Sequence, residues 1–394
     1  MSTVVRVAAR GDGVAEDGRH VAFAAPGDRL LDDGSVEPGP HHRTPPCRHF
    51  PTCGGCQLQH LDDESYAAFV ADRVATALDA QGLSAPVRPP LLSPPRTRRR
   101  ATLHAEAKGG RVLLGFAAEK SHAIVDLAEC HVLLPELFAL VAPLRAFLQR
   151  LGLRGRGDVH LAMADQGTDL LVTGVTPTGL EGADLVASFA RKHALARVAF
   201  DDGLGPTSHW EPQPVTITLG GVPVPLPPAS FLQATREGEA ALVAAATEAV
   251  SGAATVADLF AGLGTFALAL PGRVYAAEGA RDAALALRAA ANARGRSVFV
   301  EHRDLYRRPL TAAELDRFDA VVLDPPRAGA RDQAAALAAK RAGAIAYVSC
   351  NPASFARDAR LLVDAGWRLE WVQPVGQFLW STHVELAARF TRGS

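Results

Sequence analysis

The C-terminal part of the chain, from about residue 227 onward, alternates short apolar runs with Ala-rich segments of helical periodicity. This alternation is typical of a parallel sheet that helices cover on both faces. The apolar runs predict strands at residues 255–259, 274–277, 297–301, 320–323 and 344–348, and a last pair at 369–372 and 384–390. The expected fold class of this part is therefore α/β.

The middle of the chain mixes shorter alternating strands with two helices, which is typical of an α+β domain. The strands are predicted at residues 102–105, 112–116, 169–173 and 215–219, and the helices at 135–151 and 180–193. Before this region, residues 62–83 predict another helix, because apolar side chains recur at helical spacing behind an acidic first turn.

Residues 1–45 predict a small β unit that ends in a Gly/Pro-rich linker. Val4, Val5 and Val7 precede a Gly-rich turn, and a second alternating stretch follows. The unit is too short to close an oligonucleotide-binding barrel by itself.

With 394 residues the chain is long enough for two or three domains, and its 48% hydrophobic and 21% charged residues indicate an ordinary soluble protein. The formal net charge of -1 gives no overall attraction to nucleic acid, so such a partner would need a local patch. One such basic patch consists of Arg96, Arg98, Arg99 and Arg100, although a solvated loop explains these four arginines equally well. We see no leader or membrane-spanning run and expect a cytoplasmic protein.

Four of the five cysteines lie in the first third of the chain. Cys47, Cys53 and Cys56 form a C-x5-C-x2-C run whose glycines allow a tight turn, and Cys130 can supply a fourth ligand. Tetrahedral sulfur ligation fits zinc or an iron-sulfur cluster, and the spacing does not choose between them. Cys350 stands apart and therefore has another role.

A Gly-rich loop joins the predicted strand 255–259 to the segment after it, with Asp258 before the glycines and Glu278 at the end of the next strand. Glycines let the backbone approach a ligand closely, and a ribose diol suits an acid at a strand end. The same letters fit a dinucleotide site. The acid at position 258, placed to face an amino group, favours S-adenosylmethionine.

Two further strand ends carry unusual turns: Asp324-Pro325-Pro326-Arg327, and Ser349-Cys350-Asn351-Pro352. Consecutive prolines fix a rigid ledge with Asp324 at its lip. The second turn presents the Cys350 thiol at the edge where such sheets place their chemistry. An arginine in the fourth place of the ledge argues against methylation of an exocyclic amine.

Four motifs follow one another along the chain: Cys53-Gly54-Gly55-Cys56, Asp258-Leu259-Phe260, and the two turns at residues 324–327 and 349–352. With these motifs in this order, the chain resembles the RNA uracil-C5 methyltransferases. The chain is most similar to the iron-sulfur branch that makes 5-methyluridine in 23S ribosomal RNA. The resemblance implies a C-terminal Rossmann-like class I methyltransferase domain (residues 61–97 and 226–394). It also implies a central α+β iron-sulfur domain (46–60 and 98–225) and a truncated TRAM/OB-like unit (1–45), which lacks a stretch that the family normally has.

The resemblance also implies roles for single residues. The four N-terminal cysteines would hold a [4Fe-4S] cluster. Cys350 matches the nucleophile and Glu385 the base. The contacts to S-adenosylmethionine match Gln233, Phe260, Thr265, Glu278, Asp304 and Asp324, of which Asp304 is the weakest match.

The expected partner is RNA, as a loop or unpaired uridine of 23S ribosomal RNA, with no membrane and no obligate protein partner. Phe50 and the Arg cluster are candidates for holding it, with core packing and a solvated surface as their alternatives. Methylation of transfer RNA uridine by the same mechanism stays open. So do a catalytically silent iron-sulfur RNA-binding protein and an NAD-dependent oxidoreductase, although the last leaves both unusual turns unexplained.

Overall fold

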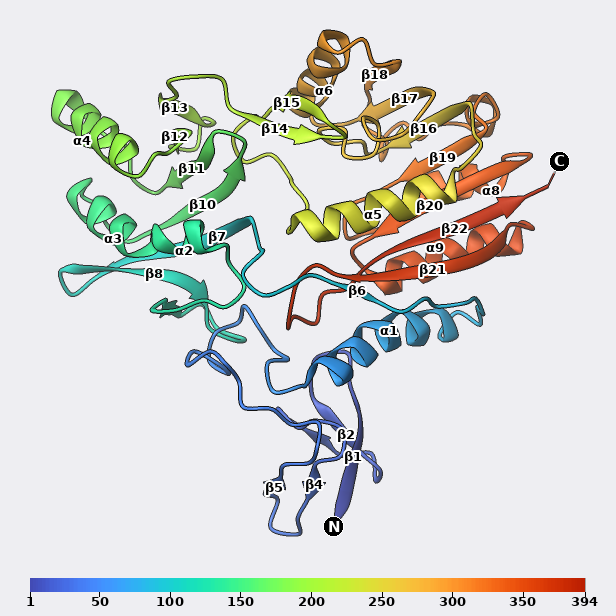
Figure 1. The fold of residues 1–394 in the computed structure, drawn as a ribbon, viewed down its shortest axis with the longest axis horizontal. Helices are drawn as coiled ribbons and strands as arrows, with labels where there is room; N and C mark the ends of the chain where they lie inside the picture. Colours follow the sequence, from blue (N-terminus) through green and yellow to red (C-terminus); the bar gives the residue numbers. More distant parts are fainter. Residues whose placement is uncertain (394) are drawn as a thin grey trace.

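The computed structural model describes residues 1–393, which form three bodies (Figure 1). The N-terminal body is a small antiparallel sheet in the order β3-β2-β1-β4-β5. Its strands are β1 (Ser2–Val7), β2 (Gly13–Ala15), β3 (His20–Val21), β4 (Arg29–Leu30) and β5 (Val36–Glu37). The alternation in the sequence predicted such a β unit. A small sheet alone does not identify a TRAM or OB fold, so that assignment stays a prediction.

The central body is a sheet in the order β13-β12-β11-β10-β7-β8-β9. Its strands are β7 (Arg100–Lys108), β8 (Arg111–Ala117), β9 (Ile124–Asp126), β10 (Arg156–Ala164), β11 (Gly167–Thr173), β12 (Arg197–Asp201) and β13 (Thr207–Trp210). α2 (Pro135–Ala139), α3 (Val141–Arg150) and α4 (Gly179–Lys192) pack on one face and close its apolar core. The predicted α+β character is confirmed.

The single helix predicted at residues 135–151 is wrong, because the structure divides it at Leu140 into α2 and α3. Pro143 explains the break. A proline has no N–H to donate to the carbonyl four residues back, here that of Ala139, and its ring clashes with that carbonyl. α2 therefore ends at Ala139, and the chain starts a new helix.

The C-terminal body is the predicted α/β sheet, in the order β18-β17-β16-β19-β20-β22-β21-β6. Its strands are β16 (Thr255–Leu259), β17 (Arg273–Glu278), β18 (Val298–His302), β19 (Ala320–Leu323), β20 (Gly343–Ser349), β21 (Arg368–Gly376), β22 (Glu385–Arg392) and β6 (Leu91–Leu92). The first five run parallel, and β22 is antiparallel to β20. Every strand predicted in this part is confirmed to within a few residues.

Helices cover this sheet on both faces (Figure 1). They are α1 (Asp63–Asp79), α5 (Arg236–Ala249), α6 (Arg281–Ala293), α7 (Ala312–Leu315), α8 (Arg331–Ala338) and α9 (Pro352–Asp364). α1 packs on α9 and β21 although the central body follows it in sequence. None of the helices within residues 1–393 combines the length and the apolar character that a membrane crossing needs.

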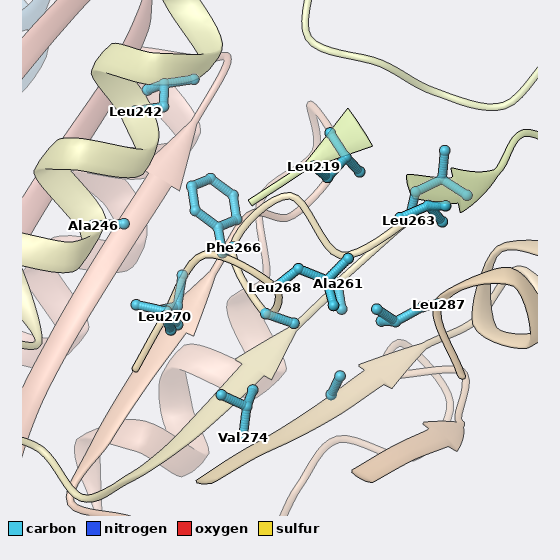
Figure 2. Close-up of a cluster of buried hydrophobic side chains, with 14 of the residues drawn as sticks. Leu219, Leu242, Ala246, Ala261, Leu263, Phe266, Leu268, Leu270, Val274 and Leu287 are labelled. Atoms are coloured by element: carbon cyan, nitrogen blue, oxygen red, sulfur yellow. The ribbon is translucent and has the colours of Figure 1, made fainter. Parts of the chain in front are cut away.

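A hairpin of β14 (Thr216–Leu219) and β15 (Val222–Pro225) packs against the C-terminal sheet. In Figure 2, Phe266 lies between Leu219 of this hairpin and Leu242 and Ala246 of α5. The sequence analysis assigned this hairpin to the central domain, whereas its apolar side chains lie in the C-terminal core. The domain boundaries themselves stay predictions.

Candidate active site

The predicted cofactor and catalytic residues lie at the carboxyl ends of the parallel strands. Phe260 follows β16, Glu278 ends β17, Asp304 follows β18, Asp324 follows β19 and Cys350 follows β20. β16 and β19 are neighbours although the chain forms β17 and β18 between them, so the strand order reverses direction at this point. Open α/β sheets bind their ligands at such a reversal.

Cys350 and Glu385 lie at adjoining ends of the paired strands β20 and β22. In the register of β20 and β22, Ser349 pairs with Leu386. Cys350 directly follows Ser349, and Glu385, the first residue of β22, directly precedes Leu386. The Cys350 side chain is half-buried, and Glu385 is only 4% exposed. The sheet therefore brings a thiol and a buried carboxyl together at its ligand-binding edge.

The loop after β19 is tied to the first turn of α9, which follows Cys350. The Asn351 side chain caps α9 by accepting from the Ala353 N–H at 3.1 Å, and it donates to the Arg327 carbonyl at 3.1 Å. Ser354 donates to the same carbonyl at 3.1 Å. These bonds fix the Asp-Pro-Pro-Arg ledge relative to the thiol.

The Gly-rich loop is held by a buried and a half-buried acid, Asp258 and Glu278. Asp258 is fully buried, and one of its carboxyl oxygens accepts from the Ala267 N–H at 2.8 Å. Its other oxygen is buried and has no hydrogen-bond partner within residues 1–393. Glu278 accepts from the N–H groups of Gly262 at 2.7 Å and Ala280 at 2.6 Å.

Phe260 has a φ of +63°, a left-handed conformation that costs a non-glycine residue energy and is frequent at ligand sites. Its ring lies 5.5 Å from that of Tyr306, whose hydroxyl donates to the Gly329 carbonyl at 3.1 Å. Asp304 is exposed and accepts from the Tyr306 N–H at 3.0 Å, and Thr265 is half-buried after the glycines. The sequence analysis missed Tyr306, which no motif marks.

Gln233 lies at the ligand-binding edge of the sheet and hydrogen-bonds to Asp324. It is 2% exposed, and its amide donates to the Asp324 carboxyl at 3.3 Å. Its carbonyl oxygen accepts from Gln377 at 2.7 Å. Gln377 directly follows β21 and is a second residue that the sequence analysis missed.

Burial dominates the electrostatics of the thiol and the acids. Burial raises the pKa of Asp324 to about 7. Burial, together with the nearby Asp324 carboxyl, raises the pKa of Glu385 to about 8. Burial raises the pKa of the Cys350 thiol to about 11, with further contributions from Glu385 and Asp324. A carboxyl that titrates near neutrality is suited to accept a proton during a reaction.

A cleft of about 810 Å³ opens beside Cys350. Its walls come from the N-terminal body, the cysteine-rich loop, β7, β8 and the segment before β22. Among the described residues that line it, the one acid is Glu119, whereas the cations are Arg10, Arg73, Arg98, Arg100, Lys120 and Arg327. A cleft of this charge attracts a polyanion even though the whole chain is nearly neutral.

The structure divides the predicted Arg cluster. Arg98 and Arg100 line the cleft, and Arg96 is exposed. Arg99 is 2% exposed; its guanidinium pairs with Glu239 at 2.5 Å and donates to the Gln233 carbonyl at 3.0 Å. The expectation that the whole cluster holds RNA is therefore wrong for Arg99, because its guanidinium is buried and already bound by Glu239 and the Gln233 carbonyl.

Phe50, the other residue expected to hold RNA, lies against Phe23 and His60, with ring centroids 5.4 and 5.9 Å away. It lines the cavity of the cysteine-rich loop and not the cleft beside Cys350. Its alternative role, packing, is the one that the structure favours.

The four N-terminal cysteines, Cys47, Cys53, Cys56 and Cys130, line one cavity together with aromatic and apolar side chains. The loop that carries three of them is fixed to the end of β8, where the Gly54 N–H donates to the Ala117 carbonyl at 2.9 Å. Within residues 1–393, no group of three or more His, Cys, Asp or Glu is spaced to hold a single metal ion. The predicted metal centre is therefore not shown.

Comparison with known proteins places this site in a family. The family described as tRNA (Uracil-5-)-methyltransferase matches residues 296–392. An uncharacterized RNA methyltransferase of Zymomonas mobilis is 51% identical over 396 residues, covering 100% of both chains. A 23S rRNA (uracil(1939)-C(5))-methyltransferase of Burkholderia ambifaria is 35% identical, covering 89% of this chain and 81% of the relative.

The chain belongs to the RNA uracil-C5 methyltransferase family. Its enzyme class is thus that of the S-adenosylmethionine-dependent RNA methyltransferases, as predicted. A solved structure, the Pyrococcus abyssi tRNA (uracil-54, C5)-methyltransferase in complex with S-adenosyl-L-homocysteine, has a TM-score of 0.74 at 23% identity. It covers 99% of this chain and 100% of its own, which confirms the class I methyltransferase fold.

Proposed function

We propose that this methyltransferase transfers a methyl group to carbon 5 of a uridine in RNA through a covalent adduct with Cys350, and that Glu385 removes the carbon-5 proton. The observation that carries this proposal is the position of Cys350 directly after β20 and of Glu385 at the start of the paired strand β22, where the carboxyl is near enough to raise the pKa of the thiol and the thiol lines the cationic cleft.

Carbon 5 of uracil is too weak a nucleophile to take a methyl group unaided. Addition of the Cys350 thiolate to carbon 6 forms a carbon–sulfur bond and turns the ring into an enolate, whose carbon 5 attacks the sulfonium methyl. S-adenosylhomocysteine leaves as the neutral product. Glu385 then takes the carbon-5 proton, the ring double bond re-forms, and the carbon–sulfur bond breaks to release the thiolate.

The cofactor contacts that we propose surround the strand ends described above. Gln233, Phe260, Thr265, Glu278, Asp304 and Asp324 would hold S-adenosylmethionine. The supporting observations are the free, buried oxygen of Asp258, the left-handed Phe260 and the position of these residues where the strand order reverses. A buried acceptor without a partner is costly unless a ligand donates to it.

The proposed substrate is an unpaired or flipped-out uridine, because a stacked base hides carbon 6 from a thiol at the bottom of a cleft. Arg98, Arg100 and Lys120 would bind the flanking phosphates. We propose 23S ribosomal RNA as the target, which the relative from Burkholderia ambifaria supports. A ribosomal RNA substrate also supports the predicted cytoplasmic location.

Transfer RNA is the second candidate substrate, since the family matched by residues 296–392 carries that description. The catalytic pair would act in the same way on either RNA. A silent RNA-binding protein is a weaker alternative, because Cys350, Glu385 and Asp324 are all present at one site.

We also propose that Cys47, Cys53, Cys56 and Cys130 hold a [4Fe-4S] cluster, which when bound would stabilise the loop between the central body and the cleft. The four thiols line one cavity, and cysteine is the usual ligand of such clusters. No metal-binding group of three or more such residues is found within residues 1–393, so the shared cavity and the family resemblance are what support this assignment. Analysis of iron, sulfide and zinc in anaerobically purified protein tests this assignment.

The decisive experiment uses RNA from a strain that lacks this protein. Ribosomal and transfer RNA are incubated separately with the enzyme and labelled cofactor, and 5-methyluridine is measured. Cys350→Ala should abolish transfer and keep cofactor binding, whereas Glu385→Gln should accumulate a covalent protein–RNA adduct. Normal turnover by either variant would overturn the catalytic assignment, and labelling of only one RNA would identify the target.

A further inference from the structure

Arg73 is a positive charge on the buried side of α1. The buried residues of this helix recur at helical spacing and include Tyr66, Phe69, Val70 and Val74. Arg73 follows Tyr66 by about two helical turns, so its side chain leaves the helix on the same side as this tyrosine. The position therefore belongs to the apolar stripe of the helix, where a charged residue is not expected.

Arg73 finds no partner for its buried nitrogen. Its Nε is buried and has no hydrogen-bond partner within residues 1–393. The side chain as a whole is half-buried and lines the cleft beside Cys350. The one acid among the described residues that line this cleft, Glu119, accepts from the Gln57 amide at 3.2 Å. A buried donor without an acceptor lowers stability, so packing alone does not explain an arginine at this position.

The helix places Arg73 beside the segment that leads to Glu385. The Tyr66 hydroxyl donates to the Phe378 carbonyl at 3.2 Å, in the connection between β21 and β22. Side chains of a helix lean toward its N-terminus, so Arg73 reaches back from its own turn toward this connection. His383, in the same connection, lines the same cleft. Arg73 thus faces the cleft from the C-terminal body, on which α1 packs.

A long arginine can also bury its stem and hold its charge in water. The surroundings of Arg73 argue against this alternative. It shares the cleft with Arg98 and Arg327, and these cations repel one another in the free protein. A phosphate between them removes the repulsion and supplies acceptors. A guanidinium group is suited to this ligand because it donates two parallel hydrogen bonds to one phosphate.

We propose that Arg73 binds a backbone phosphate of the RNA strand that enters the cleft beside Cys350. Arg98, Arg100 and Lys120 contact the same strand from the central body, so the RNA is held between the central and the C-terminal bodies. This inference rests on the proposed function, in which RNA occupies the cleft, and it adds a contact from α1, which no motif indicated.

The first test separates a ligand contact from a structural role. Arg73→Met keeps a flexible apolar stem and removes the charge. Because this change removes an unpaired buried donor from an apolar stripe, the midpoint of urea denaturation should stay unchanged or rise. A midpoint below that of the wild type would overturn the inference, since Arg73 would then stabilise the free protein.

Arg288→Met is the matched control. Arg288 is also an arginine within a helix, α6, but its guanidinium donates to the Val300 carbonyl at 2.8 Å. It is not among the described residues that line the cleft. Arg288→Met removes the same charge, so it should lower the urea midpoint and leave RNA binding unchanged.

The second test measures RNA binding with a short RNA fragment around the uridine that the deletion-strain assay identifies. Loss of one phosphate contact should reduce the slope of log Kd against log salt by about 0.7 and weaken binding about fivefold at about 0.1 M salt. Arg73→Met should show both changes. Arg73→Lys keeps the charge and loses the planar fork, so it should restore the slope and only part of the affinity. A wild-type slope in Arg73→Met would contradict the proposed contact.

A map of single phosphates tests where the contact lies. The same fragment is ethylated at random phosphates with ethylnitrosourea, and bound and free RNA are compared. Ethylation removes the charge of one phosphate, so the wild type and Arg288→Met should reject fragments ethylated at several phosphates near the target uridine. Arg73→Met should tolerate ethylation at one of these phosphates and still reject the others. A map that is unchanged, or weakened equally at every phosphate, would count against Arg73.

Failure of this inference is distinguishable from failure of the proposed function. If the wild-type enzyme methylates neither ribosomal nor transfer RNA from the deletion strain, the proposed function fails and the role of Arg73 fails with it. If the wild type methylates and binds the fragment, while Arg73→Met keeps the wild-type slope and map, only the role of Arg73 fails.

Discussion

The Glu385→Gln substitution should make the Cys350 thiol more reactive in the absence of RNA. After burial itself, Glu385 is the group that raises the pKa of this thiol most, followed by Asp324. Replacing the carboxylate with a neutral amide removes that repulsion. More of Cys350 is then ionised at a given pH, and the thiolate is the form that alkylating reagents attack.

The size of the effect follows from the pKa of Cys350, about 11 against an ordinary value of 9.0. A gap of about two units means roughly a hundredfold less thiolate below pH 9. Burial is the largest cause and persists in the variant, so Glu385→Gln recovers up to about tenfold. The gain requires an ionised Glu385 in the native protein. With its pKa of about 8, Glu385 is ionised at pH 9 and neutral at pH 6.

The assay is alkylation by iodoacetamide at pH 6 and pH 9, with the peptide that contains Cys350 measured by mass spectrometry. Glu181→Gln, at an exposed acid in the first turn of α4, is the control for an unrelated loss of charge. At pH 9, Cys350 of Glu385→Gln should be alkylated several-fold faster than Cys350 of the wild type and of Glu181→Gln. At pH 6 the three proteins should react at the same rate. Slower alkylation at pH 9 would refute the reasoning, since Glu385 would then be drawing the proton from Cys350.

Two further predictions concern the arginine cluster and the cleft. Arg99→Met should lower the free energy of unfolding by about 3 kcal/mol, because it leaves the partly buried Glu239 without its partner. Urea denaturation measures this change. An unchanged midpoint would contradict a stabilising role of the Arg99–Glu239 pair. Lys120→Ala should weaken binding of a uridine-containing RNA hairpin and reduce the slope of log Kd against log salt by about 0.7. Lys192→Ala, in the last turn of α4 and outside the lining of the cleft, should leave this slope unchanged. Equal slopes for the two variants would remove Lys120 from the RNA path.

The fold of the C-terminal body was predictable because strand periodicity and strand ends are local properties of the sequence. A parallel strand places its last residue at a known edge, so Asp324 and Cys350 could be assigned to one site before any contact was known. The four cysteines likewise converge on one cavity as their spacing predicts. Glu385 was found through the family resemblance, because an isolated glutamate in an alternating strand carries no signal of its own.

The parts that were missed depend on contacts between residues far apart in the sequence. Gln377 is significant only because Ala234 and Gln233 lie beside it, and they are more than 140 positions away. Arg99 and its neighbours look alike in the sequence, yet among them Arg99 is the buried one and pairs with Glu239. No residue type or spacing encodes such partners.

The electrostatics of the site suit a reaction in which the cofactor loses its charge midway. Buried acids at one edge, among them Asp324 and Glu385, resist ionisation until a cation approaches. With S-adenosylmethionine bound as we propose, its sulfonium would favour their ionised forms and disfavour protonation of Glu385. Methyl transfer turns the sulfonium into a neutral thioether, so the affinity of Glu385 for a proton rises just when the carbon-5 proton must be removed. The charge of the cofactor would then favour the order of the two steps that we propose.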